Sequence, residues 1–362
     1  MQKLLEEIVA VLPEVQVVGD CDKIIKDITA DSREVREGSL FICLKGAHVD
    51  GHKYLEQAAA SGAGAALVED VPEVCPDGLT LLKVADTRLG MEVIAPFFYD
   101  YPGKTMRMIG VTGTNGKTTT TNIVRAILRK AGFKVGLIGT INIMIEDEAI
   151  VAHNTTPDVV DLQRALYRMK EAGCEYVVME VSSHALALNR VAGCEYDTAA
   201  LTNITQDHLD FHKTLENYAN AKQLLFKKTR GKKIAVINGD DPHASHFELE
   251  GNQNLLISDQ KGDVLIQNIE FSHLGTTFTF KYQEKEYQTH IQMVGRYNVY
   301  NYLTAMLLIH ELGYEIDTIL ALNTKLKAPK GRMELIVYGT NGIFVDYAHT
   351  PDATLNVLES AQ

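Results

Sequence analysis

The chain has 362 residues, 46% of them hydrophobic and 23% charged, so it can bury the cores of two or three domains of about 150 residues each. Its formal net charge of −12 disfavours a general nucleic-acid binder, although a locally basic pocket can still hold one anionic nucleotide. No apolar run reaches the roughly 18–20 residues of a membrane helix. Five scattered cysteines without a C-x-x-C pair are typical of a reduced, cytoplasmic protein and disfavour a structural zinc site.

Residues 1–101 are predicted to form a small α/β domain. The opening MQKLLEEIVAVL carries Glu6 and Glu7 inside its apolar pattern, which indicates an amphipathic helix rather than a secretory signal. A later helical pattern breaks near Pro102, and we place the first domain boundary there. The other predicted elements of this domain are strands at 40–44 and 65–69 and helices at 52–62 and 87–104.

Residues 102–330 alternate between strand-like and helical segments. This alternation predicts a mostly parallel, doubly wound sheet, whose ligands bind at the carboxyl ends of its strands. From 263 to 294 the pattern has the period of two expected for a small antiparallel sheet. The remaining predicted elements are strands at 106–111, 133–139, 175–181 and 234–238, and helices at 117–131, 159–173 and 298–313.

A third domain begins near Gly331. Its residues, 331–362, supply one predicted strand at 342–348 and the start of a helix. About 30 residues cannot bury enough surface to fold alone. We therefore expect the sequence to be a fragment that stops inside this domain.

The stretch GVTGTNGKTTTTNI, at 110–123, predicts a phosphate-binding loop. The general pattern G-x-x-x-x-G-K-[ST] requires a glycine where Val111 stands. A strand, a glycine-rich turn and a helix nevertheless follow in the required order, so backbone N–H groups would face the phosphates. Lys117 would reach the terminal phosphates and the Thr118 hydroxyl would hold Mg²⁺. The loop alone does not distinguish kinases, GTPases, ATPases and ligases.

Further candidate residues follow later strands. Glu180, in MEVSSHAL, ends a predicted strand beside the loop, where a carboxylate can bind Mg²⁺. NITQDHLDFH crowds two acids and two histidines into one loop, which favours a function for His208 and leaves His212 open between function and structure. By composition alone, Lys222 is a solvated lysine on a helix.

With these residues the chain resembles the Mur ligases, the ATP-dependent amide ligases of bacterial peptidoglycan synthesis, and within that family the members that add the third residue of the peptide. The general match lies in TGTNGKTTT, MEVSSHAL, TNITQDHLDFH, NAKQLLF, GRYNVYN, GRME and VDYAHTPDA. The third-residue resemblance rests on TADSREVREGSLFICLKGAHVDGHKY (29–54) and NTTPD (154–158). The displaced glycine also fits, since the family loop is written G-T-N-G-K-[ST].

The resemblance implies an activity and a domain order. It implies ATP-dependent addition of a diamino acid, meso-diaminopimelate on family frequency and otherwise L-lysine, to UDP-N-acetylmuramoyl-L-alanyl-D-glutamate through an acyl phosphate. The choice of amino acid is expected to depend on a motif beyond residue 362. The implied domains are a UDP-binding α/β domain at 1–101, a P-loop ATPase-like ligase domain at 102–330 and the start of a Rossmann-like domain at 331–362. We expect a cytoplasmic monomer without nucleic-acid or membrane partners.

The resemblance also implies nucleotide and metal roles for matching residues. Thr118 and Glu180 would hold one Mg²⁺, and His208 a second, which Lys222 would bridge as a carbamate, in place of the solvated lysine above. Lys117, Glu180, His208, Lys222 and Arg332 form the implied catalytic set. Residues implied to bind ATP are Gly113, Thr114, Asn115, Gly116, Lys117, Thr118 and Thr119, with Asn298 and Asn301 at the adenine, Arg332 at the phosphates, and Asp346 and His349 at the nucleoside.

The implied substrate contacts belong to two groups. One group lies along the UDP moiety and comprises Ser32, Ala47, His48 and Val49. The other contacts the muramoyl-peptide and comprises Asn154, Thr155, Thr156, Ser182 and Arg190.

Two alternatives remain open from the sequence. A folylpolyglutamate-type ligase shares the loop and the central fold, but the TADSR and GAHVDGH segments favour a Mur ligase. A non-catalytic nucleotide-binding protein is the second alternative, especially for a chain that stops inside its third domain. Intact Lys117, Glu180, His208 and Lys222 favour an enzyme.

Overall fold

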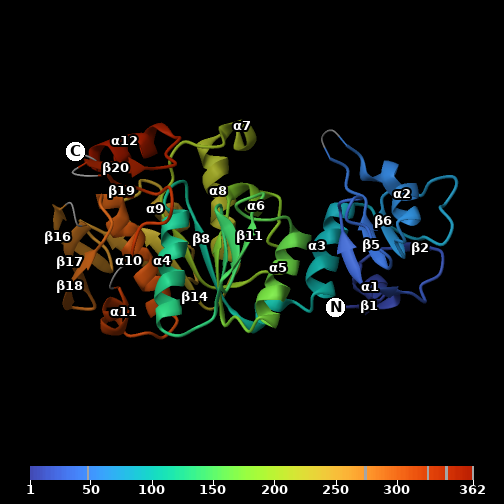
Figure 1. Ribbon diagram of the computed structural model, residues 1–362, viewed down its shortest axis with the longest axis horizontal. Coiled ribbons are helices and arrows are strands. Elements are labelled where there is room, and N and C mark those ends of the chain that lie inside the picture. Colours follow the sequence, from blue (N-terminus) through green and yellow to red (C-terminus); the bar gives the residue numbers. More distant parts are fainter. Residues whose placement is uncertain (47–48, 273–274, 324–325, 339–340, 361–362) are drawn as a thin grey trace. The chain divides into compact units, whose positions relative to one another are not determined.

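The computed structural model describes residues 1–46, 49–272, 275–323, 326–338 and 341–360. Its contacts divide the chain into two units, drawn in Figure 1. The first unit comprises Met1–Thr105, Pro157–Arg168 and Asn189–Cys194, and the second comprises Met106–Thr156, Met169–Leu188 and Glu195–Gln362. The three-domain division expected from the sequence stays a prediction.

A five-stranded sheet forms the centre of the first unit. Successive side chains of a strand point to opposite faces. In β5, Leu40 and Ile42 therefore join one apolar cluster, whereas Phe41 joins another. Both faces are buried, as is usual where strands run parallel. In sheet order the strands are β2 (Gln16–Val18), β7 (Thr80–Lys83), β6 (Ala65–Val68), β5 (Ser39–Ile42) and β4 (Asp27–Thr29), with only β2 antiparallel to its neighbour.

Helix α3 (Thr87–Phe98) covers one face of this sheet. The Asp86 carboxylate caps this helix by accepting hydrogen bonds from the backbone N–H groups of Arg88 and Leu89 in its first turn. The helix ends before the predicted residue 104, because Asp100 and Tyr101 adopt left-handed backbone conformations. The other elements here are β1 (Lys3–Leu4), α1 (Leu5–Val11), β3 (Ile24–Ile25), η1 (Gly51–Tyr54), α2 (Leu55–Ala60) and η2 (Pro102–Thr105).

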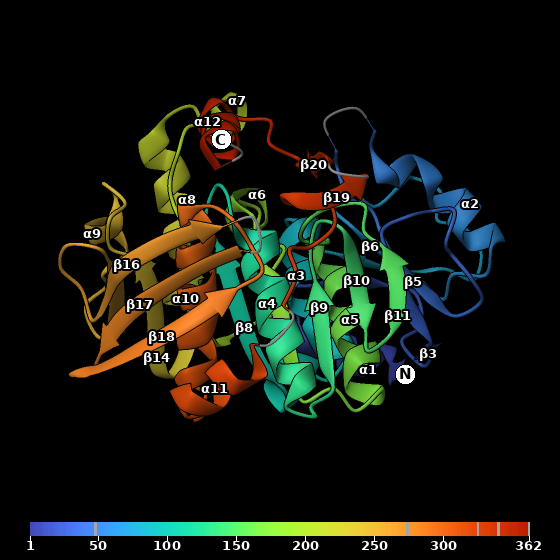
Figure 2. The same cartoon turned by 60° about the vertical axis from the view of Figure 1, so that its left-hand side comes forward.

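The second unit contains an eleven-stranded sheet, visible in Figure 2. Its central strands, β9 to β16 in sheet order, run parallel, as the sequence predicts. The predicted antiparallel strands are also confirmed, and they extend the same sheet. The order is β11 (Glu148–Val151), β10 (Asn142–Ile145), β9 (Val135–Ile138), β12 (Tyr176–Glu180), β8 (Arg107–Thr112), β13 (Tyr196–Leu201), β14 (Thr229–Asn238), β15 (Gln253–Ser258), β16 (Val264–Ser272), β17 (Gly275–Tyr282) and β18 (Lys285–Ile291).

Helices cover both faces of this sheet. On one face α4 (Lys117–Lys130) and α10 (Arg296–His310) pack side by side (Figure 2), and Val111 of β8 joins their apolar cluster. The adjacent Gly110 faces the opposite side, where Leu225 of α8 (Leu215–Lys227) lies against it. Helix α5 (Val159–Glu171) belongs to the first unit as far as Arg168. The remaining elements of the second unit are α6 (Ser183–Ala187), α7 (Leu209–His212), α9 (Ala244–Phe247), α11 (Ile316–Leu322), β19 (Glu334–Tyr338), β20 (Asn341–Val345) and α12 (Pro351–Ser360).

Strand order fixes where a ligand can bind. Strand β8 lies between β12 and β13, and the chain leaves it through α4 toward β9, beyond β12. From β12 the chain crosses to β13 on the other side of β8. The direction of winding therefore reverses at β8, and such a switch point leaves a crevice at the carboxyl ends of the strands. Among the described residues, no helix is both long enough and apolar enough to cross a membrane.

Candidate active site

A cavity of about 550 Å³ opens at the carboxyl ends of β8, β12 and β13. This is the place that the switch point predicts for a ligand. Fourteen of the residues that the resemblance assigns to ATP, metal or substrate line it together. They are Thr114, Asn115, Gly116, Lys117, Thr118, Thr119, Thr155, Glu180, His208, Asn298, Asn301, Arg332, Asp346 and His349.

Two glycines shape the loop that leads from β8 into α4. Gly113 and Gly116 have φ values of +141° and +90°, which side chains rarely adopt. A Cβ on Gly113 would lie 1.9 Å from Thr202 Oγ1, and one on Gly116 would lie 2.3 Å from Asn301 Oδ1. The loop therefore needs glycine for its backbone conformation and for the side chains packed against it.

The residue that departs from the general loop pattern lies in the core. Val111 is fully buried in β8, within the apolar cluster under α4 and α10. The turn that requires glycine begins only at Gly113, so a valine at this position does not disturb the loop.

Two lysines point their ammonium groups at the same backbone carbonyl. Lys117 Nζ donates to the oxygens of Gly113 and Thr114, both at 2.9 Å, and Lys222 Nζ donates to Gly113 at 2.7 Å. Within the described part of the chain, neither ammonium lies within salt-bridge distance of a carboxylate. Burial lowers the pKa of Lys117, and it lowers the pKa of Lys222 further, with the Lys117 charge adding to the effect. Lys222 is thus not a solvated helix lysine.

Glu180 is a carboxylate buried at the end of β12. It accepts hydrogen bonds from the Thr118 hydroxyl at 2.9 Å and from the Thr140 backbone N–H and hydroxyl, both at 3.0 Å. No cation among the described residues lies within salt-bridge distance of Glu180, although the charge of Lys117 is near enough to interact with it. Buried carboxylates are usually paired or bound to a metal, and a carboxylate next to a hydroxyl suits Mg²⁺, which keeps several waters and phosphate oxygens as ligands. The residues present therefore fit Mg²⁺.

The two histidines of the loop after β13 have different surroundings. His208 lines the cavity, has a left-handed φ of +52° and lies 3.4 Å from Asp207. Burial lowers its pKa, so its neutral, metal-binding form prevails at neutral pH. His212 is buried, and its Nε2 lies 3.0 Å from Ser183 Oγ. His212 therefore has a structural partner away from the cavity lining.

Residues at the far end of the cavity come from α10 and the C-terminal segment. Asn301 donates to Asn298 Oδ1 at 3.1 Å at the start of α10. Arg332 donates to the Thr118 hydroxyl at 3.3 Å, which brings a third cation to the phosphate loop. The Asp346 carboxylate accepts two backbone N–H groups, each at 2.7 Å.

One wall of the cavity was missed from the sequence. Asp240 accepts a hydrogen bond from Ser258 at 2.5 Å and another from the Tyr300 hydroxyl, while Arg296 pairs with Asp259. Asp240 stands two residues past the predicted strand 234–238, near the strand ends where ligands bind in such sheets. Its place after this strand could therefore have identified it as a candidate site residue. The other partners are 18 or more residues away along the chain and carry no local signal.

The predicted substrate residues fall in both units. Asn154 is exposed, Thr155 lines the cavity, and the Thr156 hydroxyl donates to the Glu180 carbonyl at 2.8 Å. Ser182 caps α6 by accepting from Ala185 at 3.2 Å. The first unit contains Ser32, in the turn after β4, exposed Val49, and Arg190. Ala47 and His48 lie outside the described residues. All these substrate roles stay predictions.

Comparison with known families matches most of the chain. The family model described as Mur ligase middle domain matches residues 111–309, and the model described as Mur ligase family, catalytic domain, matches residues 24–95. A curated protein of Bacillus licheniformis, named UDP-N-acetylmuramoyl-L-alanyl-D-glutamate–2,6-diaminopimelate ligase, is 44% identical over 353 residues. That alignment covers 95% of this chain and 72% of the relative. The Bacillus cereus protein of the same name is 42% identical over 99% of this chain and 74% of its own length.

Solved structures agree with these sequence matches. A structure named for the same 2,6-diaminopimelate ligase superposes with a TM-score of 0.82 at 28% identity, over 99% of this chain and 74% of that one. A MurF ligase from Thermotoga maritima, solved in complex with ADP, gives a TM-score of 0.70 at 23% identity, over 92% of this chain and 74% of that one. The second likeness shows the shared fold.

Proposed function

The chain belongs to the Mur ligase family, and on that premise we propose an ATP-dependent ligase that joins 2,6-diaminopimelate to UDP-N-acetylmuramoyl-L-alanyl-D-glutamate in peptidoglycan synthesis. Relatives that carry this name are 42–44% identical over almost the whole chain. The observation that carries the proposal is the cavity at the phosphate loop, which Lys117 and buried Glu180 line, with buried Lys222 donating to the Gly113 carbonyl of the same loop.

Amide formation at neutral pH requires activation, because a carboxylate lacks a good leaving group. We propose that an oxygen of the D-glutamate carboxylate attacks the γ-phosphorus of ATP, so that an acyl phosphate forms and ADP leaves. The neutral amine of the incoming amino acid then attacks the acyl carbon. The amine loses a proton, the C–O bond to phosphate breaks, and amide and inorganic phosphate result.

The cavity residues support this chemistry through charge. A carboxylate and a triphosphate repel each other, and two cations at the phosphate loop would offset that repulsion: Lys117, which donates to the Thr114 carbonyl, and Arg332, which donates to the Thr118 hydroxyl. Mg²⁺, when bound, supplies further positive charge to the phosphates. Glu180 and Thr118 hold oxygen ligands 2.9 Å apart for it. Helix α4 begins directly after Gly116, and the backbone N–H groups of its first turn are suited to bind an anion.

Lys222 is proposed to carry a carbamate. Only a neutral amine attacks CO₂, forming an N–C bond and releasing one proton, and burial lowers the pKa of Lys222 toward that neutral state. The product would be an anion near His208, and these two side chains would together supply ligands for a second Mg²⁺. Carbon-13 NMR of protein incubated with labelled bicarbonate tests this step. A carbamate signal that survives in Lys222→Met would refute it.

The remaining expectations enter as proposals. We propose that residues 1–101 bind the UDP moiety, that residues 102–330 bind ATP, and that residues 331–362 begin the domain that presents the amino acid. Support comes from the separate family matches at 24–95 and 111–309. We further propose a cytoplasmic monomer, which size-exclusion chromatography with light scattering would test.

A phosphate-release assay tests the function. The protein is incubated with ATP, Mg²⁺, UDP-N-acetylmuramoyl-L-alanyl-D-glutamate and, in separate reactions, meso-diaminopimelate, L-lysine or L-glutamate. We expect release with meso-diaminopimelate and formation of the tripeptide by mass spectrometry.

Other outcomes of this assay point to other functions. Release with L-lysine alone would change the amino acid and keep the ligase. Release only with a folate and L-glutamate would indicate a folylpolyglutamate-type ligase. Nucleotide binding without release in any mixture would indicate a non-catalytic protein.

A further inference from the structure

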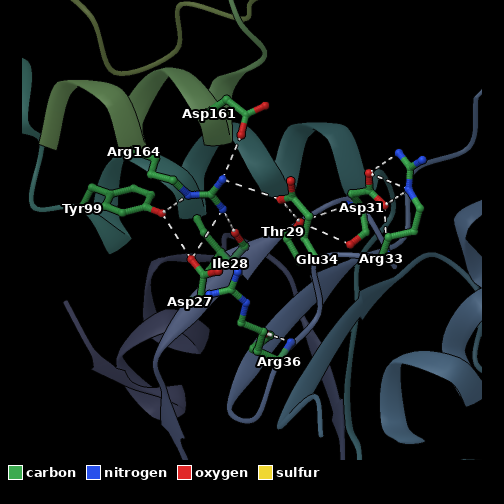
Figure 3. A network of polar contacts seen from close by, with 11 residues as sticks. Asp27, Ile28, Thr29, Asp31, Arg33, Glu34, Arg36, Tyr99, Asp161 and Arg164 are labelled. Carbon is green, nitrogen blue, oxygen red and sulfur yellow. Dashed lines mark hydrogen bonds and ion pairs between the residues drawn. The ribbon is translucent and has the colours of Figure 1, made fainter. Parts of the chain in front are cut away.

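One arginine of α5 holds the strand that leads into the turn of Ser32. Arg164 Nη2 donates to the backbone carbonyl of Ile28, in β4, at 2.9 Å. Its Nε donates to the hydroxyl of Tyr99, just after α3, at 3.2 Å. Figure 3 shows the guanidinium between these partners, so that one side chain joins three segments of the first unit. A planar guanidinium has N–H groups in a fixed fork, which the ammonium of lysine cannot reproduce.

Three carboxylates surround the same guanidinium. Asp161 lies 3.0 Å away, Asp27 3.5 Å and Glu34 3.8 Å. The side chains of Asp161 and Glu34 are 62% and 56% exposed, and ion pairs at such exposure contribute little to folding stability. The cluster therefore matters more for the local electrostatic potential than for holding the fold together. Without Arg164, these three carboxylates would lose their shared cation, and Arg33 would remain as a charge partner of Glu34.

The contacts continue from Arg164 into the turn. The Thr29 hydroxyl donates to Glu34 Oε2 at 3.4 Å, and the Asp31 backbone N–H donates to the Thr29 hydroxyl at 3.0 Å. The Asp31 carboxylate in turn accepts the Arg33 backbone N–H at 2.9 Å (Figure 3). Ser32 stands in the middle of this turn. The position of the turn is thus tied to the guanidinium through two consecutive side chains.

We propose that Arg164 is a positioning residue for the UDP end of the substrate. It fixes the turn that carries Ser32, and its positive charge partly offsets the carboxylates that would repel the diphosphate. The inference rests on the proposed function, in which Ser32 lies along the UDP moiety. Its two parts, geometry and charge, make different demands on a substitute at position 164.

Equilibrium binding of UDP-N-acetylmuramoyl-L-alanyl-D-glutamate, measured by calorimetry on the whole chain, tests the proposal. We expect Arg164→Gln to raise Kd for this ligand about tenfold at low salt, and less at high salt, where the exposed carboxylates are screened. Arg164→Lys keeps the charge and loses the fork, so its Kd should lie between those of the wild type and Arg164→Gln. Kd for ATP should stay unchanged in both variants.

A second substitution separates charge from geometry. Glu34→Gln alone is expected to change Kd little, because the amide oxygen can still accept the Thr29 hydroxyl that links this residue to the turn. In the Arg164→Gln background, Glu34→Gln removes one repelling carboxylate and should recover part of the lost affinity. Arg230→Gln in the second unit is the matched control, since its guanidinium also donates to a backbone carbonyl, of Met106 at 2.7 Å, and pairs with Asp197 at 2.8 Å. It should lower thermal stability without changing the Kd of the UDP ligand.

The outcomes distinguish this inference from the proposed function. A wild-type chain that does not bind the UDP ligand would overturn the proposed function. If the wild-type chain binds the UDP ligand, and Arg164→Gln and Arg164→Lys bind it with the wild-type Kd at every salt concentration, the role of Arg164 would be overturned. An equal loss of affinity for ATP and the UDP ligand, together with lower stability, would reduce Arg164 to a structural residue and also overturn it.

Discussion

The cavity of the second unit and the Arg164 cluster of the first unit treat charge in opposite ways. At the phosphate loop, partly buried Lys117 and fully buried Lys222 donate to backbone carbonyls, and neither pairs with a carboxylate of the described residues. In the cluster, Arg164 is 30% exposed and has three carboxylates around it. The cavity thus has unmatched positive charge, which a triphosphate would complete. The cluster already pairs its one cation with three carboxylates, so it can fix the turn without attracting an anion itself.

The contrast has an energetic consequence. A buried ammonium without a counter-ion costs free energy, which shows as the lowered pKa of both lysines. Binding of an anion offsets that cost, so we infer that the cavity gives up folding stability in exchange for affinity. The exposed pairs of the first unit carry no comparable cost.

Lys117 provides the strongest test of this contrast, because the unmatched charge of the cavity should be essential for phosphate release. Lys117→Ala removes a preorganised donor to the transferring phosphoryl group, and we expect phosphate release to fall by about 10²–10³-fold. The unfolding temperature without nucleotide should stay equal or rise, since an unmatched buried cation is gone. Lys134→Ala is the control, because exposed Lys134 also donates to a carbonyl, of Ala172 at 3.0 Å. Normal turnover by folded Lys117→Ala would falsify the assignment.

The carboxylate of the cavity provides the next test. Glu180→Gln keeps the shape of the side chain but removes its charge, so we expect the Mg²⁺ concentration for half-maximal phosphate release to rise by roughly tenfold or more. A chelator should abolish release in every variant. Glu175→Gln, exposed at the opposite end of β12, should keep the wild-type Mg²⁺ dependence. An unchanged Mg²⁺ titration in Glu180→Gln would separate this carboxylate from the metal.

Loop rigidity can be tested with two glycines at the two ends of α4. Gly113→Ala combines a left-handed backbone with a clash against Thr202, and we expect it to lower the free energy of unfolding by about 2–4 kcal/mol. At Gly132 the φ of +94° is similarly strained, but nothing lies within 4 Å of an added Cβ. Gly132→Ala should therefore cost only about 1 kcal/mol. If denaturant unfolding shows the same loss of unfolding free energy for both variants, Thr202 must move aside to accommodate the added Cβ.

The smallest effect concerns a buried thiol of the first unit. Burial raises the pKa of Cys43 to about 12 from the 9.0 of a free thiol. Between these values the unfolded state binds fewer protons than the folded state, so stability falls as pH rises above about 9. Relative to Cys43→Ala, the wild type should lose about 1 kcal/mol between pH 8 and pH 10 in urea unfolding. Cys43→Ser should lose the same slope, and a slope that persists in both variants would assign it to another group.

Local patterns predicted the centre of the second unit well. A strand, a glycine turn and a helix follow one another at β8 and α4, and the predicted bounds differ from the structure by one residue at most. The hairpin of β10 and β11 was missed, because these short strands lie at the sheet edge and β11 has mostly exposed residues. An exposed edge strand lacks the apolar period that sequence reading depends on.

Site residues could be predicted from the sequence where they lie at the carboxyl end of a predicted strand. Glu180 follows a buried strand, and strand ends meet at one edge of a parallel sheet. The burial of Lys222 has no such signal, because it arises from the Gly113 carbonyl 109 residues earlier. The same holds for Arg164, whose partners Ile28 and Tyr99 lie far away in the sequence. Contacts of this kind exist only once the elements have packed.

The two glycines of the phosphate loop also bear on how this protein can evolve. Gly113 lies against Thr202 and Gly116 against Asn301, so any side chain at either glycine requires its neighbour to shrink in the same step. Each neighbour also holds the loop or the helix after it: the Thr202 hydroxyl donates to the Asn115 carbonyl at 2.6 Å, and Asn301 Oδ1 accepts from the Thr120 hydroxyl of α4 at 3.4 Å. A single substitution of either glycine would therefore cause a clash, and a single substitution of either neighbour would remove a hydrogen bond. Genetic drift can change the outer surface of α4 freely, while the backbone beneath the phosphates can change only through paired mutations.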